Sequence, residues 1–429
     1  MIQDTSRELL DFIRRSPSCY HAAENLCAML REAGYTELRE QTRWRLEKGG
    51  RYFVLRGGSA VLAFRVPERV TGGFLLAAAH GDSPTFKIKE NPERVSAGHY
   101  IQLSTEKYGG MIVPSWFDRP LSAAGRVLVK NGSRIEARTV DLDRDLLVIP
   151  HVAIHMDRTV NDGKTYRANV DTLPLLGDLS AKGRFEELVA QAAGVPKEDI
   201  LGRDLFLYCR QAGTVLGEKG EYLLSPKLDD LECAYGCMQG FLQAEEGESI
   251  PVCCVFNHEE VGSATAQGAA SAFLRDTLRR IALALGEDEE GYQILLSRSF
   301  LVSADNAHAQ HPNHPEYADS GNCPYLNEGI VIKFNAAQRY ATDGVSCAVF
   351  RQVCEKAGVK TQVFANRSDL AGGSTLGSIA DTMVPVPTVD IGLPQLAMHS
   401  AVETAGAADF RDLIAAMRVY FSGCVCAAE

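Results

Sequence analysis

Four short, strongly apolar segments in the second half of the chain constrain its fold more than any other feature. They are PVCCVFN (251–257), SFLVSAD (299–305), EGIVIKFN (328–335) and VPTVDIG (386–392), and helical patterns separate them. Apolar runs of this length are typical of strands buried on both faces, whereas strands with one wet face alternate apolar and polar residues. The alternation of such strands with helices therefore predicts an α/β fold built on a mostly parallel sheet covered by helices.

The first half of the chain has a different organisation. Residues 1–35 have helical patterns, and residues 52–66 and 73–82 are strand-like segments punctuated by glycine. Residues 92–215 contain short alternating runs and a hairpin signal at Asn131-Gly132, which predicts an antiparallel unit. A chain of 429 residues exceeds what one core usually organises. We therefore predict one domain formed by residues 1–91 and 216–429, interrupted by a β-rich domain at residues 92–215.

Charge and composition exclude several classes of protein. The net charge of −11 argues against a nucleic-acid surface, and no apolar run reaches the roughly 18–20 residues that span a bilayer. The N-terminus has the pattern of a charged amphipathic helix rather than of a signal peptide, so we expect a cytoplasmic protein with no nucleic-acid or membrane partner. The cysteines lie in apolar segments, which predicts buried, unpaired thiols. Cys424 and Cys426 are only a weak indication of metal binding.

Polar residues follow the predicted strands at the edge where an open α/β sheet builds its site. They combine imidazoles with carboxylates, and histidine nitrogen and carboxylate oxygen are both ligands of zinc. These residues are His80, Asp82, His258, Glu259, Glu260, Asp305, His308 and His399, joined by Asp229 and Asp230 at the start of a helix that we expect Ser225 to cap.

The set is large enough to hold two divalent metal ions that share one carboxylate. We assign His80 and Asp305 to one ion and Glu260 and His399 to the other, and Asp229 to the bridge between them. Zinc is the expected metal, with cobalt or manganese as alternatives.

Two neighbours of the ligands have supporting roles in this interpretation. Asp82 can accept the free ring N–H of His80 and so fix its tautomer. Glu259 binds no ion and can act as the general base that takes a proton from water. Each residue also has an ordinary structural explanation, such as a solvated pair of glutamates or an aspartate that caps a helix. Their joint placement at several strand ends favours the metal site.

Eight segments, in unbroken order along nearly the whole chain, resemble the aspartyl aminopeptidase family of metallopeptidases, which includes the vacuolar aminopeptidase of yeast. They are AAAHGDSPTFKIK, DRPLSAAGRV, PHVAIHMDRTVN, KLDDLECAYG, NHEEVGS, SADNAHAQHPN, VIKFNAAQRYATD and PQLAMHS. The resemblance implies a two-zinc exopeptidase that removes N-terminal residues from peptides. It also implies that the inserted β-rich domain mediates dimerisation and that dimers assemble into a homododecamer.

The resemblance adds residues that the spacing of ligands does not reveal. His155 matches a histidine that reaches from a neighbouring subunit into the active site, where it would stabilise the oxyanion. His308, Lys333 and Tyr340 match positions that contact the substrate, as does the ligand Asp305.

The expected substrate has an N-terminal Asp or Glu, because Lys333 offers a fixed cation after an apolar strand. A solvated lysine at a strand end is the alternative explanation for this residue. For the protein, the alternatives are an aminopeptidase of the same fold that prefers neutral residues such as Leu, and an inactive assembly or cargo homologue. The segment GGSTLGS (372–378), and Asp230 where many relatives have Asn, depart from the family pattern and bear on substrate preference.

Overall fold

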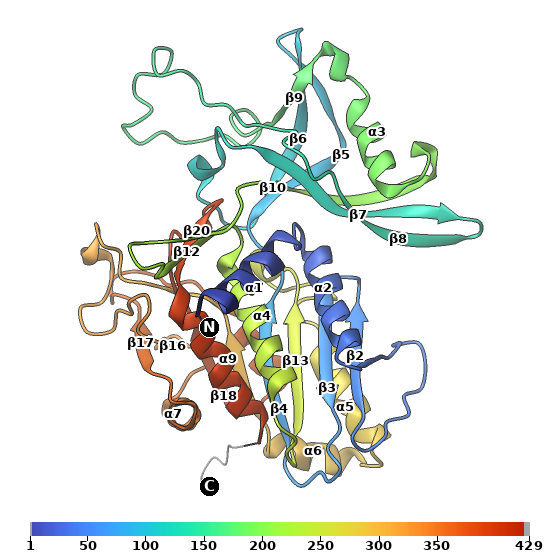
Figure 1. Cartoon of the computed structure of the whole chain (residues 1–429), viewed down its shortest axis with the longest axis vertical. Helices are drawn as coiled ribbons and strands as arrows, with labels where there is room; N and C mark the ends of the chain where they lie inside the picture. The colour runs from blue at the N-terminus through green and yellow to red at the C-terminus, as the bar shows by residue number, and fades with distance from the viewer. Residues whose placement is uncertain (1, 424–429) are drawn as a thin grey trace.

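The computed structural model describes residues 2–423, which form two lobes (Figure 1). The larger lobe contains a nine-stranded sheet with helices on both faces, and the smaller lobe contains a six-stranded sheet. Cys424 and Cys426 lie outside the described residues. Every cysteine from residue 2 to residue 423 is an unpaired thiol, as predicted, and all of these except the half-buried Cys19 and Cys323 are also buried. None of the helices in this range has the length and apolarity needed to cross a membrane.

The nine-stranded sheet has the order β1-β2-β3-β13-β4-β14-β18-β16-β17. Its strands are β1 (Thr36–Glu37), β2 (Arg51–Arg56), β3 (Ala60–Arg65), β4 (Phe74–His80), β13 (Ile250–Phe256), β14 (Phe300–Ala304), β16 (Ile330–Phe334), β17 (Thr361–Ala365) and β18 (Thr388–Gly392). Five of its eight neighbouring pairs are parallel (β1–β2, β13–β4, β14–β4, β14–β18 and β16–β17), so the predicted mostly parallel sheet is confirmed. However, β16 runs antiparallel to β18, so its carboxyl end does not lie at the same edge as that of β18.

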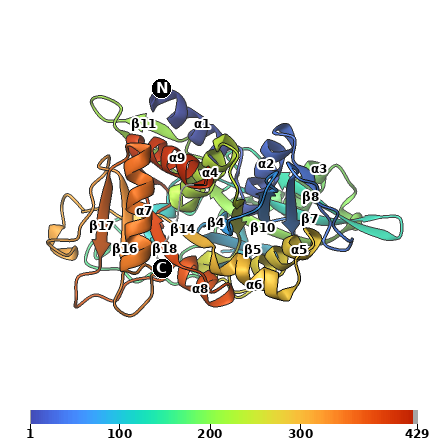
Figure 2. The same ribbon diagram turned by 90° about the horizontal axis from the view of Figure 1, so that it is seen from below.

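Helices cover both faces of this sheet (Figure 2). One face packs against α1 (Ile2–Arg14), α2 (Cys19–Glu32), α4 (Leu228–Gln243), α7 (Gly344–Ala357) and α9 (Ala407–Phe421), and the other packs against α5 (Phe273–Ala284), α6 (Glu289–Ser297) and α8 (Leu376–Met383). Within β3, Val61 and Ala63 enter the first core, whereas Leu62 and Phe64 enter the second. Because successive side chains of a strand point to opposite faces, a strand buried on both sides needs a continuous apolar sequence.

The smaller lobe is an antiparallel sheet with its own apolar core. Its strands are β5 (Thr85–Ser96), β6 (Tyr100–Tyr108), β7 (Leu121–Asn131), β8 (Arg134–Asp141), β9 (Leu175–Asp178) and β10 (Ile200–Cys209), in the order β8-β7-β10-β5-β6-β9. The hairpin at Asn131-Gly132 joins β7 to β8, as predicted. One helix, α3 (Arg184–Ala193), buries Phe185 and Val189 in this core. The division into domains at residues 92 and 215 stays a prediction, and the sheet itself begins seven residues earlier, at Thr85.

Arg126 of β7 connects the two lobes. Its Nε donates to Asp204 Oδ2 at 3.0 Å, and its Nη1 donates to the carbonyl oxygen of Gly57, in the larger lobe, at 2.6 Å. Asp204 also accepts from Lys87 Nζ at 2.9 Å. The carboxylate of Asp204 therefore holds the guanidinium in the orientation that reaches across the junction.

A third sheet, near the junction of the lobes, corrects two predictions (Figure 1). It has the order β11-β12-β20-β19-β15 and contains β11 (Thr214–Leu216), β12 (Tyr222–Ser225), β15 (Ala307–His308), β19 (Pro394–Leu396) and β20 (Glu403–Gly406). Ser225 does not cap a helix, because it pairs with Glu403 at the end of β12, and α4 begins at Leu228. Nor do residues 387–398, the apolar segment that precedes His399, form one strand. The chain leaves the large sheet after β18, where Pro394 has no N–H to continue the ladder, and joins the third sheet as β19.

Candidate metal centre

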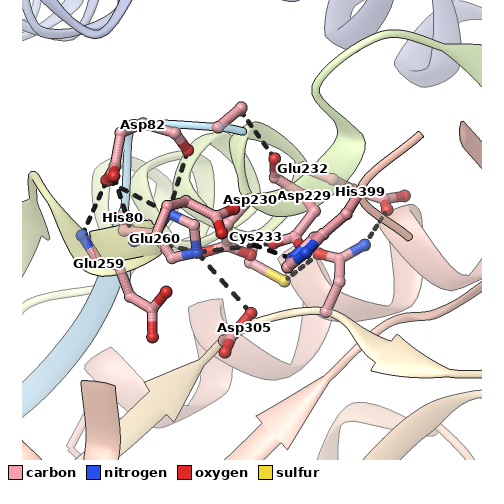
Figure 3. A network of polar contacts seen from close by, with 12 residues as sticks. His80, Asp82, Asp229, Asp230, Glu232, Cys233, Glu259, Glu260, Asp305 and His399 are labelled. Atoms are coloured by element: carbon pink, nitrogen blue, oxygen red, sulfur yellow. Dashed lines mark hydrogen bonds and ion pairs between the residues drawn. The ribbon is translucent and has the colours of Figure 1, made fainter. Parts of the chain in front are cut away.

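Two groups of metal-ligand atoms share the carboxylate of Asp229 (Figure 3). Asp229 Oδ1 lies 3.5 Å from His80 Nε2, which is 3.8 Å from Asp305 Oδ1. Asp229 Oδ2 lies 3.3 Å from His399 Nε2, which is 3.4 Å from Glu260 Oε2. Two ligands bound about 2.0–2.1 Å from a tetrahedral zinc ion stand about 3.3–3.4 Å apart. Each oxygen of Asp229 therefore belongs to a set of atoms with approximately the spacing of a zinc site.

The topology explains why these five side chains meet. His80 is the last residue of β4, and Asp305 directly follows β14, the parallel neighbour of β4. Parallel neighbours end at the same edge of a sheet, so these two residues lie together. Glu260 lies in the single 3-10 turn Glu259–Val261 after β13, and Asp229 lies in the first turn of α4. His399 approaches from the turn that follows β19 of the third sheet.

The unbonded oxygens of the centre test whether a cation fits it. Asp229 Oδ1, Asp230 Oδ1 and Glu260 Oε1 are buried and accept no hydrogen bond from any residue between 2 and 423. Burial, and then the charge of Asp229, raises the pKa of Glu260 well above its usual range. An ionised carboxylate is costly to bury unless a donor or a cation compensates it. The donor set therefore fits divalent cations that accept both nitrogen and oxygen.

Asp230 is a candidate ligand that sequence reasoning left unassigned. It forms one ligand group with His80, Asp229 and Asp305, and its Oδ2 accepts the backbone N–H of His80 at 3.1 Å. Burial alone would lower the pKa of His80, but Asp230, followed by Asp229 and Asp305, raises it well above its usual value. The motif KLDDL showed both aspartates, but only the fold brings the second one against His80.

Asp82 supports the centre differently from the prediction. The hydrogen-bond partner of His80 Nδ1 is the main-chain carbonyl oxygen of Asp82 at 3.1 Å, whereas the Asp82 carboxylate is 3.5 Å away. That carboxylate instead accepts the backbone N–H groups of Glu259 and Glu260, each at 3.2 Å, and the hydroxyl of Tyr108 at 2.6 Å. Asp82 therefore fixes the turn that carries both glutamates.

Glu259 lies beside the two groups of ligands without belonging to either (Figure 3). Burial raises the pKa of its carboxyl group to about 7; His80 opposes this shift, while Asp305 and Asp82 add to it. A group with a pKa near the working pH is suited to proton transfer. The two adjacent glutamates thus have different surroundings.

Lys333 is not the solvated lysine that the sequence left as one alternative. Its side chain is 2% exposed, and Nζ donates to the carbonyl oxygens of Asp305 and Asn306 at 2.7 and 3.2 Å. Nζ also lies 3.7 Å from Asp305 Oδ2 and 5.3 Å from the centre of the Tyr340 ring. The predicted contact of Lys333 with substrate stays a prediction, and the observed contacts direct its ammonium group at Asp305, a candidate metal ligand.

His308 and Tyr340 meet around an aromatic residue that the sequence did not indicate. Phe364 of β17 makes edge-to-face contacts with both, at ring-centre distances of 5.8 Å to His308 and 6.3 Å to Tyr340. His308 retains an exposed edge, but loss of water around the ring, and then the Lys333 ammonium, lowers its pKa. Tyr340 is buried.

A hollow opens on the outer side of His308. Its volume is about 770 Å³ with the space open to solvent included, and its wall includes His308, His311, His314 and Arg367. No aspartate or glutamate lines it. Arg367 is the side chain of this lining that carries a permanent charge, and its Nε and Nη2 donate to the carboxylate of Asp369 at 2.6 and 2.9 Å.

His155 lies apart from these residues in the described chain. It is exposed in the turn-rich loop at residues 150–171 of the smaller lobe (Figure 1). None of the ligand groups formed within residues 2–423 includes it. Its predicted role in the site of a neighbouring subunit stays a prediction.

Comparison with known proteins places the whole chain among metallopeptidases. The family model described as aminopeptidase I zinc metalloprotease (M18) matches residues 12–421. A probable M18 family aminopeptidase 2 of Clostridium acetobutylicum is 45% identical over 412 residues, which cover 94% of this chain and 95% of that protein. A protein of the same description from Pseudomonas aeruginosa is 38% identical over 431 residues, covering 98% and 99% of the two chains.

Solved structures agree with this result. The chain resembles one chain of the cryo-EM structure of the Ape4 and Nbr1 complex, with a TM-score of 0.95 and 34% identity. The match covers 98% of this chain and 86% of that chain. It resembles the mApe1 dodecamer of S. cerevisiae with a TM-score of 0.86 and 26% identity, covering 97% and 96% of the two chains.

Proposed function

Since the chain belongs to the M18 family of zinc aminopeptidases, we propose that it hydrolyses the first peptide bond of peptides at a centre of two divalent metal ions. The observation that carries the proposal is the position of Asp229, whose two oxygens face separate histidine–carboxylate pairs. In this proposal His80 and Asp305 would hold one ion, His399 and Glu260 would hold the other, and Asp229 would contribute an oxygen to each. Zinc ions bound in this way would polarise the scissile carbonyl and lower the pKa of water.

Glu259 is the proposed general base. It takes a proton from the attacking water and later delivers it to the amine that leaves. Two observations support this role: Glu259 belongs to neither group of ligands, and burial raises its pKa to about 7. The concentration of carboxylates around the centre also attracts the free α-amino group of the substrate, which restricts cleavage to the N-terminal residue.

We further propose a preference for N-terminal Asp or Glu. The hollow beside His308 supports it, because three histidines line this hollow as hydrogen-bonding groups and no carboxylate does, while the Arg367 guanidinium is paired with Asp369. Lys333 supports it less directly, since its ammonium group is occupied by the carbonyl oxygens of Asp305 and Asn306. A neutral preference, such as Leu, is the competing outcome of a substrate panel.

The proposed assembly is a homododecamer built from dimers, in a cytoplasmic protein. The dodecamer of the S. cerevisiae relative supports the assembly. The exposed loop that carries His155, which also exposes Val152, Ile154 and Met156, supports a contact with a neighbouring subunit, because clustered exposed apolar side chains mark interaction surfaces. His155 would act there as a hydrogen-bond donor to the oxyanion of the neighbour's substrate.

Substitution of the adjacent glutamates tests the proposed mechanism. Glu259→Gln should retain both metal ions and lower the turnover number by about 10²–10⁴-fold, the usual contribution of general-base catalysis. Glu260→Gln should lose one of the two ions. Metal content measured by atomic emission, with rates on Asp-, Glu-, Leu- and Ala-anilides, checks both expectations. Equal metal content and equal rates in the two variants would contradict the division of roles, and fastest cleavage of Leu would contradict the acidic preference.

A further inference from the structure

Glu403 is a buried carboxylate that connects two separate ligand-bearing segments. It is the first residue of β20 and is 1% exposed. Its Oε1 accepts the backbone N–H of His399 at 2.7 Å, and its Oε2 accepts the backbone N–H of Asp229 at 3.0 Å. One carboxylate therefore holds the main chain of two of the residues in the second ligand group.

Neither of these N–H groups has a place in regular secondary structure. His399 has a φ of 66°, in the left-handed region that a residue with a side chain rarely adopts. Asp229 lies in the first turn of α4 but has a φ of −79° and a ψ of 109°, which are not helical. An N–H group in the first turn of a helix or in an irregular turn has no helical acceptor and needs another one, and here the same carboxylate provides it for both.

We propose that Glu403 is a positioning residue that sets the separation between Asp229 and His399. Because its two oxygens are fixed relative to each other, the two bonds fix one backbone relative to the other. They thereby hold Asp229 Oδ2 and His399 Nε2 at 3.3 Å, a separation that suits two ligands of one metal ion. This inference rests on the proposed metal centre, in which these residues and Glu260 hold the second ion.

A glutamine at this position would keep the shape of the side chain but not its function. A carboxylate has two acceptor oxygens, whereas an amide has one oxygen and an NH₂ group that would face an N–H donor. Glu403→Gln therefore breaks one of the two bonds. Loss of an interaction that supports a ligand typically weakens metal binding by about 10–100-fold, and we expect this loss for the ion held by His399 and not for the other.

The chain provides a matched control at Asp409. This residue is also 1% exposed and also accepts two backbone N–H groups, from Asn327 at 2.6 Å and Gly329 at 2.9 Å, but neither donor belongs to a ligand. Asp409→Asn removes the same kind of bond from another part of the fold. It should lower the thermal stability of the metal-free protein and leave both metal affinities unchanged.

Both zinc affinities can be measured directly on full-length protein from which metal has been removed. The protein is titrated with zinc in competition with a zinc-sensitive chelator. Glu403→Gln and Glu403→Asp should both weaken one site, because the shorter aspartate keeps the charge but cannot reach both donors. Wild-type affinity in Glu403→Asp would overturn positioning in favour of charge alone, and wild-type affinity in both variants would overturn the proposal. Failure of both variants to fold, with Asp409→Asn folded, would also overturn it by assigning Glu403 to the fold.

A ligand variant separates this inference from the proposed function. His399→Gln should lose the second ion whether or not Glu403 positions it. If His399→Gln loses the ion while both Glu403 variants retain it, the inference fails and the metal centre stands. If His399→Gln also retains both ions at wild-type affinity, the assignment of the ligands is wrong, and the inference fails with it.

Discussion

Replacement of Lys333 by methionine distinguishes a lysine that supports the metal centre from one that contacts the substrate. Methionine has a similar length and no charge, so it fills the buried space and removes the donors. The lost contacts are the hydrogen bonds from Nζ to the carbonyl oxygens of Asp305 and Asn306, at 2.7 and 3.2 Å. Each hydrogen bond from a charged donor contributes about 1.5–3 kcal/mol, and relief from burying the ammonium group offsets part of that sum. We expect the free energy of unfolding to fall by about 2–4 kcal/mol.

Urea denaturation of the metal-free protein measures this change without interference from bound zinc. Lys360→Met is the matched control, because Lys360 pairs with Glu328 at 3.0 Å on the surface, with its side chain 75% exposed. An exposed pair of this kind contributes at most about 1 kcal/mol, so the control should unfold almost as the wild type does. Zinc affinity of the His80–Asp305 site should also fall in Lys333→Met, because the backbone of Asp305 loses its anchor.

The opposite pattern would refute this reasoning. If Lys333→Met unfolds like the wild type but cleaves Asp-anilide much more slowly relative to Leu-anilide, the ammonium group contacts the substrate carboxylate. The lysine would then act as the sequence resemblance predicts, and its contacts with Asp305 would be broken when substrate binds. Loss of stability with an unchanged ratio of Asp to Leu cleavage would instead leave the hollow beside His308 as the source of acidic preference.

Two further predictions concern the smaller lobe. His155→Ala should lose most activity while retaining its metal ions, and mixing it with Glu259→Gln under conditions of subunit exchange should restore some activity, unless His155 acts within its own subunit. Asp204→Asn should lower stability by about 1 kcal/mol at pH 7. Burial alone would raise the pKa of Asp204, but Lys87 and then Arg126 lower it. The stabilisation from the ionised carboxylate is therefore present above the unfolded-state pKa of about 4 and is lost as pH falls through the folded-state pKa. A urea series at several pH values should show the two proteins converge in acid, and a constant difference would contradict the reasoning.

The sequence predicted the part of the centre that depends on parallel strands. His80 and Asp305 follow continuous apolar runs, and the carboxyl ends of neighbouring parallel strands meet at one edge. The chemistry and the motif of His399 also indicate a ligand. The single strand predicted before it is wrong, because the chain passes from one sheet to another at Pro394. Periodicity cannot reveal such a change, since both segments are short, apolar and extended.

The supporting contacts could not be predicted from the sequence, because they join side chains to distant main chain. Glu403 and Asp229 are separated by 174 positions, and their bond depends on a backbone N–H that every non-proline residue possesses. Lys333 and Asp305 are separated by 28 positions, and no local pattern around Lys333 indicates that its side chain is buried. A residue type at a fixed spacing can suggest a ligand, but an acceptor for backbone groups has no such pattern.

Hydrogen bonds distinguish the buried carboxylates that hold other parts of the chain from the proposed metal ligands. Both oxygens of Asp82, Glu403 and Asp409 accept backbone N–H groups, and those of Asp390 accept the N–H of Ala341 and the hydroxyl of Thr375. Among residues 2–423, the buried carboxylate oxygens that accept no hydrogen bond belong instead to Asp229, Asp230, Glu260 and Glu232.

Glu232 differs from the other three residues because it belongs to neither ligand group. Burial raises its pKa to about 8, although a hydrogen bond from Asn306 opposes the shift. Burial also raises the pKa of Glu403, but the backbone N–H groups of Asp229 and His399 oppose that shift and stabilise its ionised form. Glu232 Oε1 accepts no hydrogen bond, so a proton on this carboxyl group avoids a buried charge without a partner. Within residues 2–423, the other buried carboxylate oxygens that accept no hydrogen bond belong to Asp229, Asp230 and Glu260, which form the proposed metal centre. This distribution favours Asp230 as an additional oxygen donor to the metal ion beside His80. It also explains how the protein stays folded with so many buried acids, because the carboxylates that would not bind a cation either accept two hydrogen bonds or retain a proton.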